Sequence, residues 1–235
     1  MTQAMPRTLR RVRRAAMPEM VADLAVWLIG RVVLRVMADG SLAGGRIVET
    51  EAYSPDDAAS HAFRGRTPRN GAMFGRAGTA YVYRAYGTSW MLNIAAGPVG
   101  VGTAVLIRAL VPEIGLNAIG MARGAVALRD LARGPGRLAA ALAIDSSLDG
   151  TDLCAPNPGV SGPLLLAEPR DAATLPPEAL PVAAGPRIGI TKAVERPYRF
   201  FVPPPHDLAR FVSGPAWLNR SGVLIRTAPG PDGGV

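Results

Sequence analysis

The sequence has few of the residues that build metal centres and disulfides. It contains one cysteine and two histidines, so Cys154 cannot form an internal disulfide and a Cys/His zinc site is disfavoured. A single cysteine also fits a reducing compartment. We therefore expect a cytoplasmic protein that needs no metal and no other cofactor.

Long apolar runs and several catalytic motifs are also missing. The most apolar early run, AVWLIG at 25–30, is far shorter than the roughly 20 residues that span a bilayer, and no clear cleavage site marks a signal peptide. We therefore predict no membrane contact. Lys192 is the only lysine, which leaves one side chain for Schiff-base chemistry. No P-loop, no GxGxxG after a strand and no GxSxG elbow occur.

Positive charge is what the sequence has in excess. The net charge is +8, carried almost wholly by arginine. A polyanionic partner rewards summed positive charge, and arginine can grip a phosphate with two hydrogen bonds. A coding bias could exchange lysine for arginine, but it would not produce the net charge.

Strand and helix patterns do not alternate regularly, which favours an α+β fold over a parallel βαβ sheet. We predict a single compact domain over residues 17–227, with a curved, mainly antiparallel β-sheet core flanked by helices. A flexible basic arm (1–16) would precede it and a disordered tail (228–235) would follow. Expected strands are 31–40, 45–53, 79–87, 103–111, 187–191 and 198–202; expected helices are 18–30, 125–132 and 137–144, and 155–186 reads as loop.

The stretch GRIVETEAY (45–53) carries two acids at alternate positions of an expected strand. Strict alternation would place Ile47, Glu49, Glu51 and Tyr53 on one face. Acids are poor strand formers and are rarely fully buried, so the pair is either a solvated strand end or a functional site. Alternation cannot choose between the two glutamates.

Aromatic and basic residues gather in the same region. Four of the five tyrosines lie between residues 53 and 86. Rings interleaved with arginines suit unstacked bases, although packing of the core is an equally open reading. His61, close after two aspartates, is either a base or a structural residue. Arg108 shares an expected strand face with Leu106 inside an apolar run, where a buried arginine needs an anionic partner such as a glutamate.

Several blocks, in order and at matching spacing, resemble the alkyladenine (3-methyladenine) DNA glycosylases. They are GRIVETEAYSPDDAASHAFRGRTPRNGAMFGRAGTAYVYRAYG, MLNIA, AVLIRAL and LARGPGRLAAALAI. The similarity runs from about residue 19 to residue 202. It implies a monofunctional enzyme of base excision repair that acts on double-stranded DNA, flips out a damaged purine and hydrolyses its N-glycosidic bond, leaving an abasic site.

The resemblance also implies roles for single residues. Glu51 would be the general base that activates a water, held in place by Arg108. Tyr53 would stack on one face of the flipped base. Tyr86 would be the wedge that fills the gap in the duplex. The remaining implied positions are His61 and Tyr83 on the other face of the base, Asn93 and Leu106 at the pocket floor, where Asn93 rejects guanine, and Arg64 and Arg69 as DNA contacts.

Two other readings remain open at this point. A protein of the same fold could bind lesions or RNA without excising them, if its pocket were occluded or Glu51 faced solvent. A hydrolase of free nucleosides would need neither a basic arm nor a wedge. We further expect a monomer, associated with the nucleoid through DNA.

Overall fold

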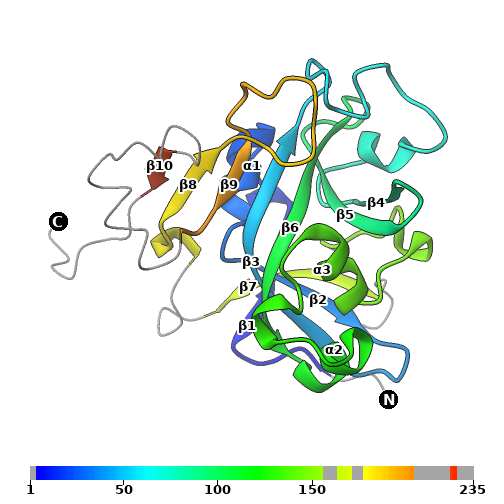
Figure 1. Cartoon of the computed structure of the whole chain (residues 1–235), viewed down its shortest axis with the longest axis vertical. Coiled ribbons are helices and arrows are strands. Elements are labelled where there is room, and N and C mark those ends of the chain that lie inside the picture. Colours follow the sequence, from blue (N-terminus) through cyan, green and yellow to red (C-terminus); the bar gives the residue numbers. More distant parts are fainter. Residues whose placement is uncertain (1–3, 156–162, 171–176, 204–222, 227–235) are drawn as a thin grey trace, which may run out of the picture.

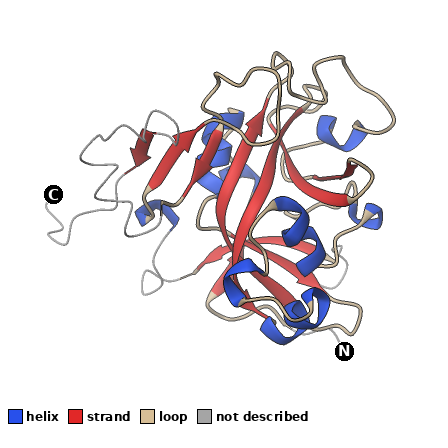
Figure 2. Cartoon of the chain, viewed as in Figure 1, coloured by secondary structure: helices blue, strands red, loops and turns tan. Residues whose placement is uncertain are grey.

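The computed structural model describes residues 4–155, 163–170, 177–203 and 223–226. These residues form one sheet of ten strands, in which every strand pair is antiparallel, together with three α-helices and several short 3-10 helices (Figures 1 and 2). The predicted α+β class is confirmed. The strands are Leu9–Arg11 (β1), Val32–Val36 (β2), Leu42–Tyr53 (β3), Ala80–Ala85 (β4), Ser89–Ala96 (β5), Thr103–Ile114 (β6), Leu164–Pro169 (β7), Val182–Gly185 (β8), Arg199–Phe201 (β9) and Val223–Arg226 (β10); the helices are Val21–Leu28 (α1), Leu116–Arg123 (α2) and Pro135–Ala141 (α3).

Two long strands, β3 and β6, form the centre of the sheet. The strand order is β1-β7-β2-β3-β6-β5-β4, and β9 also pairs with β3 and continues the sheet through β8 to β10. The first half of β3 pairs with β2 and its second half with β9. The β4–β5 hairpin lies beyond β6. The strands β3 and β6 and this hairpin together carry most of the candidate functional residues.

Two helices pack against the central strands. In α1 the apolar positions Leu24, Ala25 and Leu28 are fully buried, which is the spacing of one helix face. The helix packs on β3, where the Thr50 hydroxyl donates a 2.9 Å hydrogen bond to the Ala25 carbonyl. α3 packs in the same way across β5 and β6 (Figure 1).

An irregularity in the central strand pair changes the predicted face of one residue. The β3–β6 register runs from Ile47 opposite Leu110 to Thr50 opposite Ile107, and it skips Val48 on one strand and Arg108 on the other. Such a bulge breaks the alternation of side chains. Ile47 is therefore buried in the main core, and the prediction that it shares a face with Glu51 and Tyr53 is wrong.

Several predicted boundaries also differ from the structure. The expected helix over 125–132 is wrong. α2 lies earlier, ends at Arg123 and is followed by Gly124, whose φ of +68° suits a glycine. Within 125–132 only Leu128–Asp130 forms a 3-10 turn. Residues 187–191 are a loop, not a strand. The expected loop over 155–186 contains β7 and β8, because its apolar runs pair with β2 and β9.

The N-terminal segment differs from a flexible arm over its second half. Leu9–Arg11 form the edge strand β1, which pairs with β7, and Arg14 forms an ion pair with Asp152. The tail over 228–235 lies outside the described residues, and the single domain over 17–227 stays a prediction. Within the described ranges, no helix is long and apolar enough to cross a membrane.

Candidate active site

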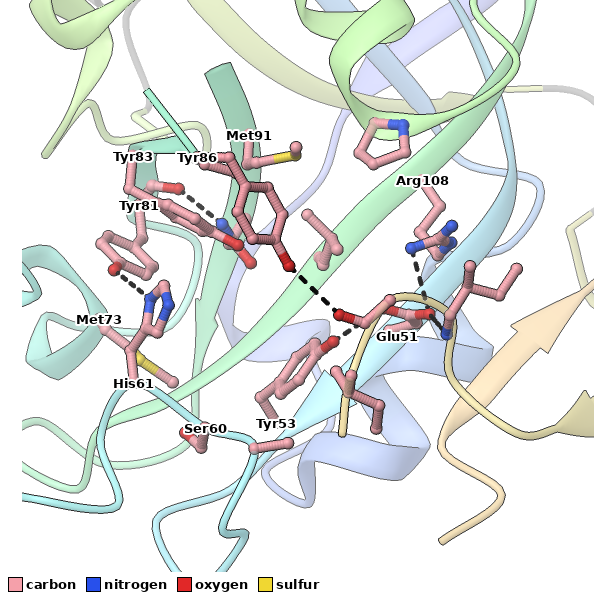
Figure 3. Close-up of a pocket in the computed structure, with 18 of the residues that line it drawn as sticks. Glu51, Tyr53, Ser60, His61, Met73, Tyr81, Tyr83, Tyr86, Met91 and Arg108 are labelled. Carbon is pink, nitrogen blue, oxygen red and sulfur yellow. Dashed lines mark hydrogen bonds and ion pairs between the residues drawn. The ribbon is translucent and has the colours of Figure 1, made fainter. Parts of the chain in front are cut away.

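A cavity of about 720 Å³ opens between the central strands, the β4–β5 hairpin and two loops. Glu51 and Tyr53 reach it from β3, and Leu106 and Arg108 reach it from β6. Figure 3 shows Glu51 and Arg108 on one side of the cavity and the His61–Tyr81–Tyr83 cluster across from them. The cavity therefore has a carboxylate and a guanidinium on one side and an aromatic wall on the other.

Glu51 is fully buried, and both of its carboxylate oxygens accept hydrogen bonds. The Ile188 backbone N–H donates to Oε1 at 2.8 Å, and the Tyr53 hydroxyl donates to Oε2 at 2.8 Å. Arg108 Nη1 lies 3.2 Å from Oε1. Since a carboxylate has about four lone-pair positions, Oε2, which accepts one hydrogen bond, can accept a further one.

Arg108 contacts both glutamates of the GRIVETEAY stretch. Its Nε donates to Glu49 Oε1 at 3.1 Å, while Nη1 faces Glu51. Arg199 also donates to Glu49 at 3.1 Å. The prediction that buried Arg108 pairs with a glutamate is confirmed, and it pairs with both. Glu51 alone of the two acids lines the cavity.

Tyr53 is held by its hydroxyl and by its ring. Burial, and secondarily the Glu51 charge, raise the pKa of Tyr53 well above its ordinary value, so the hydroxyl stays protonated and acts as a donor to Glu51. The guanidinium of Arg187 lies 4.6 Å from the ring centroid. These two contacts fix the Tyr53 ring in one orientation, as part of the cavity wall.

The opposite wall is a cluster of three rings. His61 lies edge-on to Tyr83 with centroids 4.5 Å apart, and Tyr83 stacks on Tyr81 at 5.4 Å. His61 Nδ1 shares a 2.8 Å hydrogen bond with the Tyr81 hydroxyl. Burial, followed by the Glu51 charge, raises the pKa of Tyr83 to about 12. Burial also raises the pKa of Tyr81, so both tyrosine hydroxyls stay protonated near pH 7. Burial lowers the pKa of His61, which favours its neutral form.

The floor of the cavity is set by the pairing of β5 and β6. Asn93 lies opposite Leu106 in the register, and both line the cavity. The Asn93 amide donates from Nδ2 to the Tyr81 carbonyl at 3.1 Å. Its orientation is thereby fixed, with Oδ1 left for another contact.

Tyr86 occupies the tip of the β4–β5 hairpin. Its φ of +51° and that of Gly87, +68°, place two successive residues in the left-handed region, as in the tight turns that join antiparallel strands. The side chain is 89% exposed and lies over the rim of the cavity, where its hydroxyl donates weakly to the Gly189 carbonyl at 3.5 Å (Figure 3). A bulky residue at a strained turn position is uncommon in the absence of a functional reason.

Sequence comparison identifies the family to which this architecture belongs. The sequence model described as Methylpurine-DNA glycosylase (MPG) matches residues 15–205. The chain belongs to the methylpurine-DNA glycosylase family. It is therefore a DNA glycosylase, a DNA-repair enzyme that hydrolyses N-glycosidic bonds.

Curated bacterial relatives agree with this assignment. A Mesorhizobium japonicum protein is 50% identical over 207 residues, which cover 88% of this chain and 92% of the relative. A Granulibacter bethesdensis protein is 50% identical over 77% of this chain and 79% of its own length. A Paraburkholderia phytofirmans protein is 42% identical over 87% and 89%, respectively. Each is named as an inferred 3-methyladenine DNA glycosylase.

The cavity brings together nearly all of the side chains singled out from the sequence. Arg69 also lines it, whereas Arg64 lies in an exposed loop away from the lining. Their assigned contacts with DNA stay predictions. No group of three or more His, Cys, Asp or Glu side chains that could hold a metal occurs in the described part of the chain.

Sequence reasoning missed one wall of the cavity. Residues 188–192 line the cavity as a loop, and Arg187, just before them, forms a fully buried ion pair with Asp57. The sequence does contain signals: a glycine, Gly189, interrupts the RIGIT run, and a buried arginine beside an apolar run requires an anion. In the structure Gly189 has a φ of +78°, which suits a loop. Sequence spacing does not show which aspartate supplies the anion.

His61 supplies a pH-dependent prediction. His61 is exposed as a whole residue, but partial burial of its ring, and then the Arg69 charge, lower the pKa of His61. The folded state therefore binds this proton less readily than the unfolded chain, where histidine titrates near pH ~6.5. The resulting stability is present above that pH and lost as pH falls. We expect the free energy of unfolding in urea to fall between about pH 7.5 and about pH 5.5, and to fall less steeply for His61→Gln. Equal slopes would contradict this assignment.

Proposed function

We propose that this glycosylase flips alkylated purines out of double-stranded DNA and hydrolyses the N-glycosidic bond with a water activated by Glu51. Etheno and deaminated purines are further candidate substrates, because they share the purine outline that the ring-lined cavity accepts. We also propose that the enzyme acts as a monomer in the cytoplasm, at the nucleoid, and without a cofactor. The observation that carries the mechanism is a buried carboxylate in the wall of an aromatic-lined cavity.

Glu51 has the contacts that a general base needs. Hydrogen bonds from Ile188 and Tyr53, together with the ion pair with Arg108, fix the carboxylate in one orientation. The remaining acceptor position would bind a water, take its proton and direct the oxygen at C1′ of the deoxyribose. The negative charge would also stabilise the oxocarbenium-like sugar as the bond to the base breaks. Water adds to the sugar, the purine leaves, and the strand stays intact.

The aromatic walls would hold the flipped base between them. Tyr53 would stack on one face, and His61 with Tyr83 on the other. Purines alkylated at N3 or N7 are cationic, and electron-rich rings attract cations. Asn93, with its amide fixed by the Tyr81 carbonyl, would discriminate against the exocyclic amine of guanine, since an undamaged base would meet a steric or unpaired polar contact.

Tyr86 would fill the gap that the flipped nucleotide leaves in the duplex. We expect Tyr86→Ala to weaken binding to a lesion duplex by about tenfold or more, because stacking by one aromatic side chain contributes roughly 1–3 kcal/mol. The side chain is almost fully exposed, so the urea midpoint should not change. Fluorescence anisotropy with a labelled hypoxanthine duplex measures the affinity. An unchanged affinity would remove Tyr86 as the wedge.

The alternative of a lesion-binding protein without excision has less support. It would be favoured by an occluded pocket or by a solvent-facing Glu51, whereas the cavity is open and Glu51 is buried in its wall. The test is incubation of the protein with a duplex that carries one hypoxanthine, ethenoadenine or 7-methylguanine, followed by alkali. We expect strand breaks at the lesion. Binding without base release would establish the alternative.

A further inference from the structure

The most deeply buried ion pair of the described residues lies behind the cavity rather than in it. The side chains of Asp57 and Arg187 are both 0% exposed, and neither lines the cavity. Arg187 donates to both carboxylate oxygens of Asp57, at 3.0 Å from Nη2 to Oδ1 and by a closer contact from Nη1 to Oδ2. A buried ion pair is a poor source of stability, because desolvation offsets its attraction. Its presence beside the site therefore points to a role other than stability.

Arg187 lies where two of the three contacts of Glu51 originate. Its Nη1 donates to the Ala52 carbonyl at 3.0 Å, which fixes the backbone between Glu51 and Tyr53. Its guanidinium lies 4.6 Å from the centre of the Tyr53 ring. The next residue, Ile188, donates its backbone N–H to Glu51. One side chain thus locates the donor to each carboxylate oxygen.

Arg187 also fastens the loop that carries this backbone donor. Its Nη2 donates to the Ala193 carbonyl at 3.2 Å, so the two ends of the 188–192 cavity wall attach to one guanidinium. Asp57 holds the guanidinium and, through Oδ1, accepts from the Ala59 N–H at 3.0 Å. The pair therefore links the β3 end, the loop after it and the 188–192 wall at a single point.

We propose that the Asp57–Arg187 pair is a positioning device for Glu51: it sets the Tyr53 hydroxyl and the Ile188 N–H so that the carboxylate faces the reacting water. This rests on the proposed function, in which Glu51 is the base. Arg187 and Asp57 do not touch the base or the water. Because a misplacement of about 1 Å can slow a reaction by about 10²-fold, loss of the pair should reduce the rate of the chemical step more than lesion binding.

The chain contains a matched control for this proposal. Asp56 and Arg196 form an ion pair between the same two segments, at 3.0 Å, but at the surface, where their side chains are 70% and 30% exposed. Neither residue lines the cavity. If the pairs only tethered the two segments, loss of either pair would weaken the tether. Positioning of Glu51, in contrast, depends on the buried pair alone.

The test compares two double variants of the full chain, Asp57→Asn with Arg187→Gln and Asp56→Asn with Arg196→Gln. Removing both charges at once leaves no unpaired charge in the core, and asparagine keeps the acceptor for Ala59. Single-turnover base release at saturating enzyme gives the rate, and its dependence on enzyme concentration gives the affinity for a hypoxanthine duplex. We expect the buried-pair variant to lose about 10²-fold in rate and less than about threefold in affinity, with the surface-pair variant unchanged.

Three outcomes decide the proposal. A rate within about threefold of the surface-pair variant would overturn it, as would equal losses of rate and affinity. If the buried-pair variant shows no cooperative unfolding transition, Arg187→Lys replaces it, because lysine keeps the charge opposite Asp57 without the planar guanidinium; the same loss of rate is expected, and a wild-type rate would overturn the proposal. Glu51→Gln is measured alongside: full activity there would remove the proposed function itself, whereas an inactive Glu51→Gln beside an active buried-pair variant would remove only this inference.

Discussion

Glu51→Gln is expected to lower base release by about 10²–10⁴-fold, the usual contribution of a general base. Glutamine keeps the shape of the side chain, and its oxygen can still accept the hydrogen bond from Tyr53 or from Ile188. It cannot take a proton from water or stabilise the cationic sugar by charge. Single-turnover release of hypoxanthine, followed by alkaline cleavage, measures the effect. Lesion affinity should remain within a few-fold of the wild-type value.

Glu49→Gln is the matched control, because it removes the other carboxylate that contacts Arg108. Glu49 binds Arg108 and Arg199 but does not line the cavity. We therefore expect a much smaller loss of rate for this variant than for Glu51→Gln. The reverse order of the two losses would assign the base to Glu49 and contradict the mechanism.

This comparison of two acids shows how far the sequence predicts the site. Alternation along GRIVETEAY correctly places Glu49, Glu51 and Tyr53 away from the core, since all three contact the site or its charged partners. It fails for Ile47, because the irregularity at Val48 and Arg108 shifts the alternation between positions 47 and 49. The selection of Glu51 came from the family resemblance, and the structure supplies the physical difference: Glu51 alone of the two lines the cavity.

The parts that the sequence could not predict depend on contacts between distant residues. Asp57 and Arg187 lie 130 positions apart, and no local pattern specifies their pairing. β7 and β8 follow from pairing with β2 and β9, so their strand character is decided by tertiary partners rather than by intrinsic propensity. The long, locally consistent runs, such as α1 and the strands β2 and β3, are predictable because their signals lie within a short window.

The largest expected effect on stability comes from removing only one charge of the buried Asp57–Arg187 pair. We expect Asp57→Asn to lower the free energy of unfolding by about 3–5 kcal/mol, because it leaves the Arg187 charge buried without an anion. Asparagine is nearly isosteric, so packing changes little and the lost charge dominates. Urea unfolding monitored by circular dichroism gives the free energy, with the slope of the transition checked for an unchanged denatured state.

The double variant Asp57→Asn with Arg187→Gln should be more stable than Asp57→Asn alone, since it leaves no unpaired charge in the core. Asp56→Asn, at the exposed pair one residue earlier, should have almost no effect, because solvent screens surface ion pairs. An Asp57→Asn midpoint equal to that of Asp56→Asn would mean that water reaches Arg187 or that the chain relaxes around it. The distinction matters for catalysis. If removing one charge destabilises the fold, whereas removing both charges mainly slows base release, the pair contributes to the orientation of Glu51 rather than to the stability of the sheet.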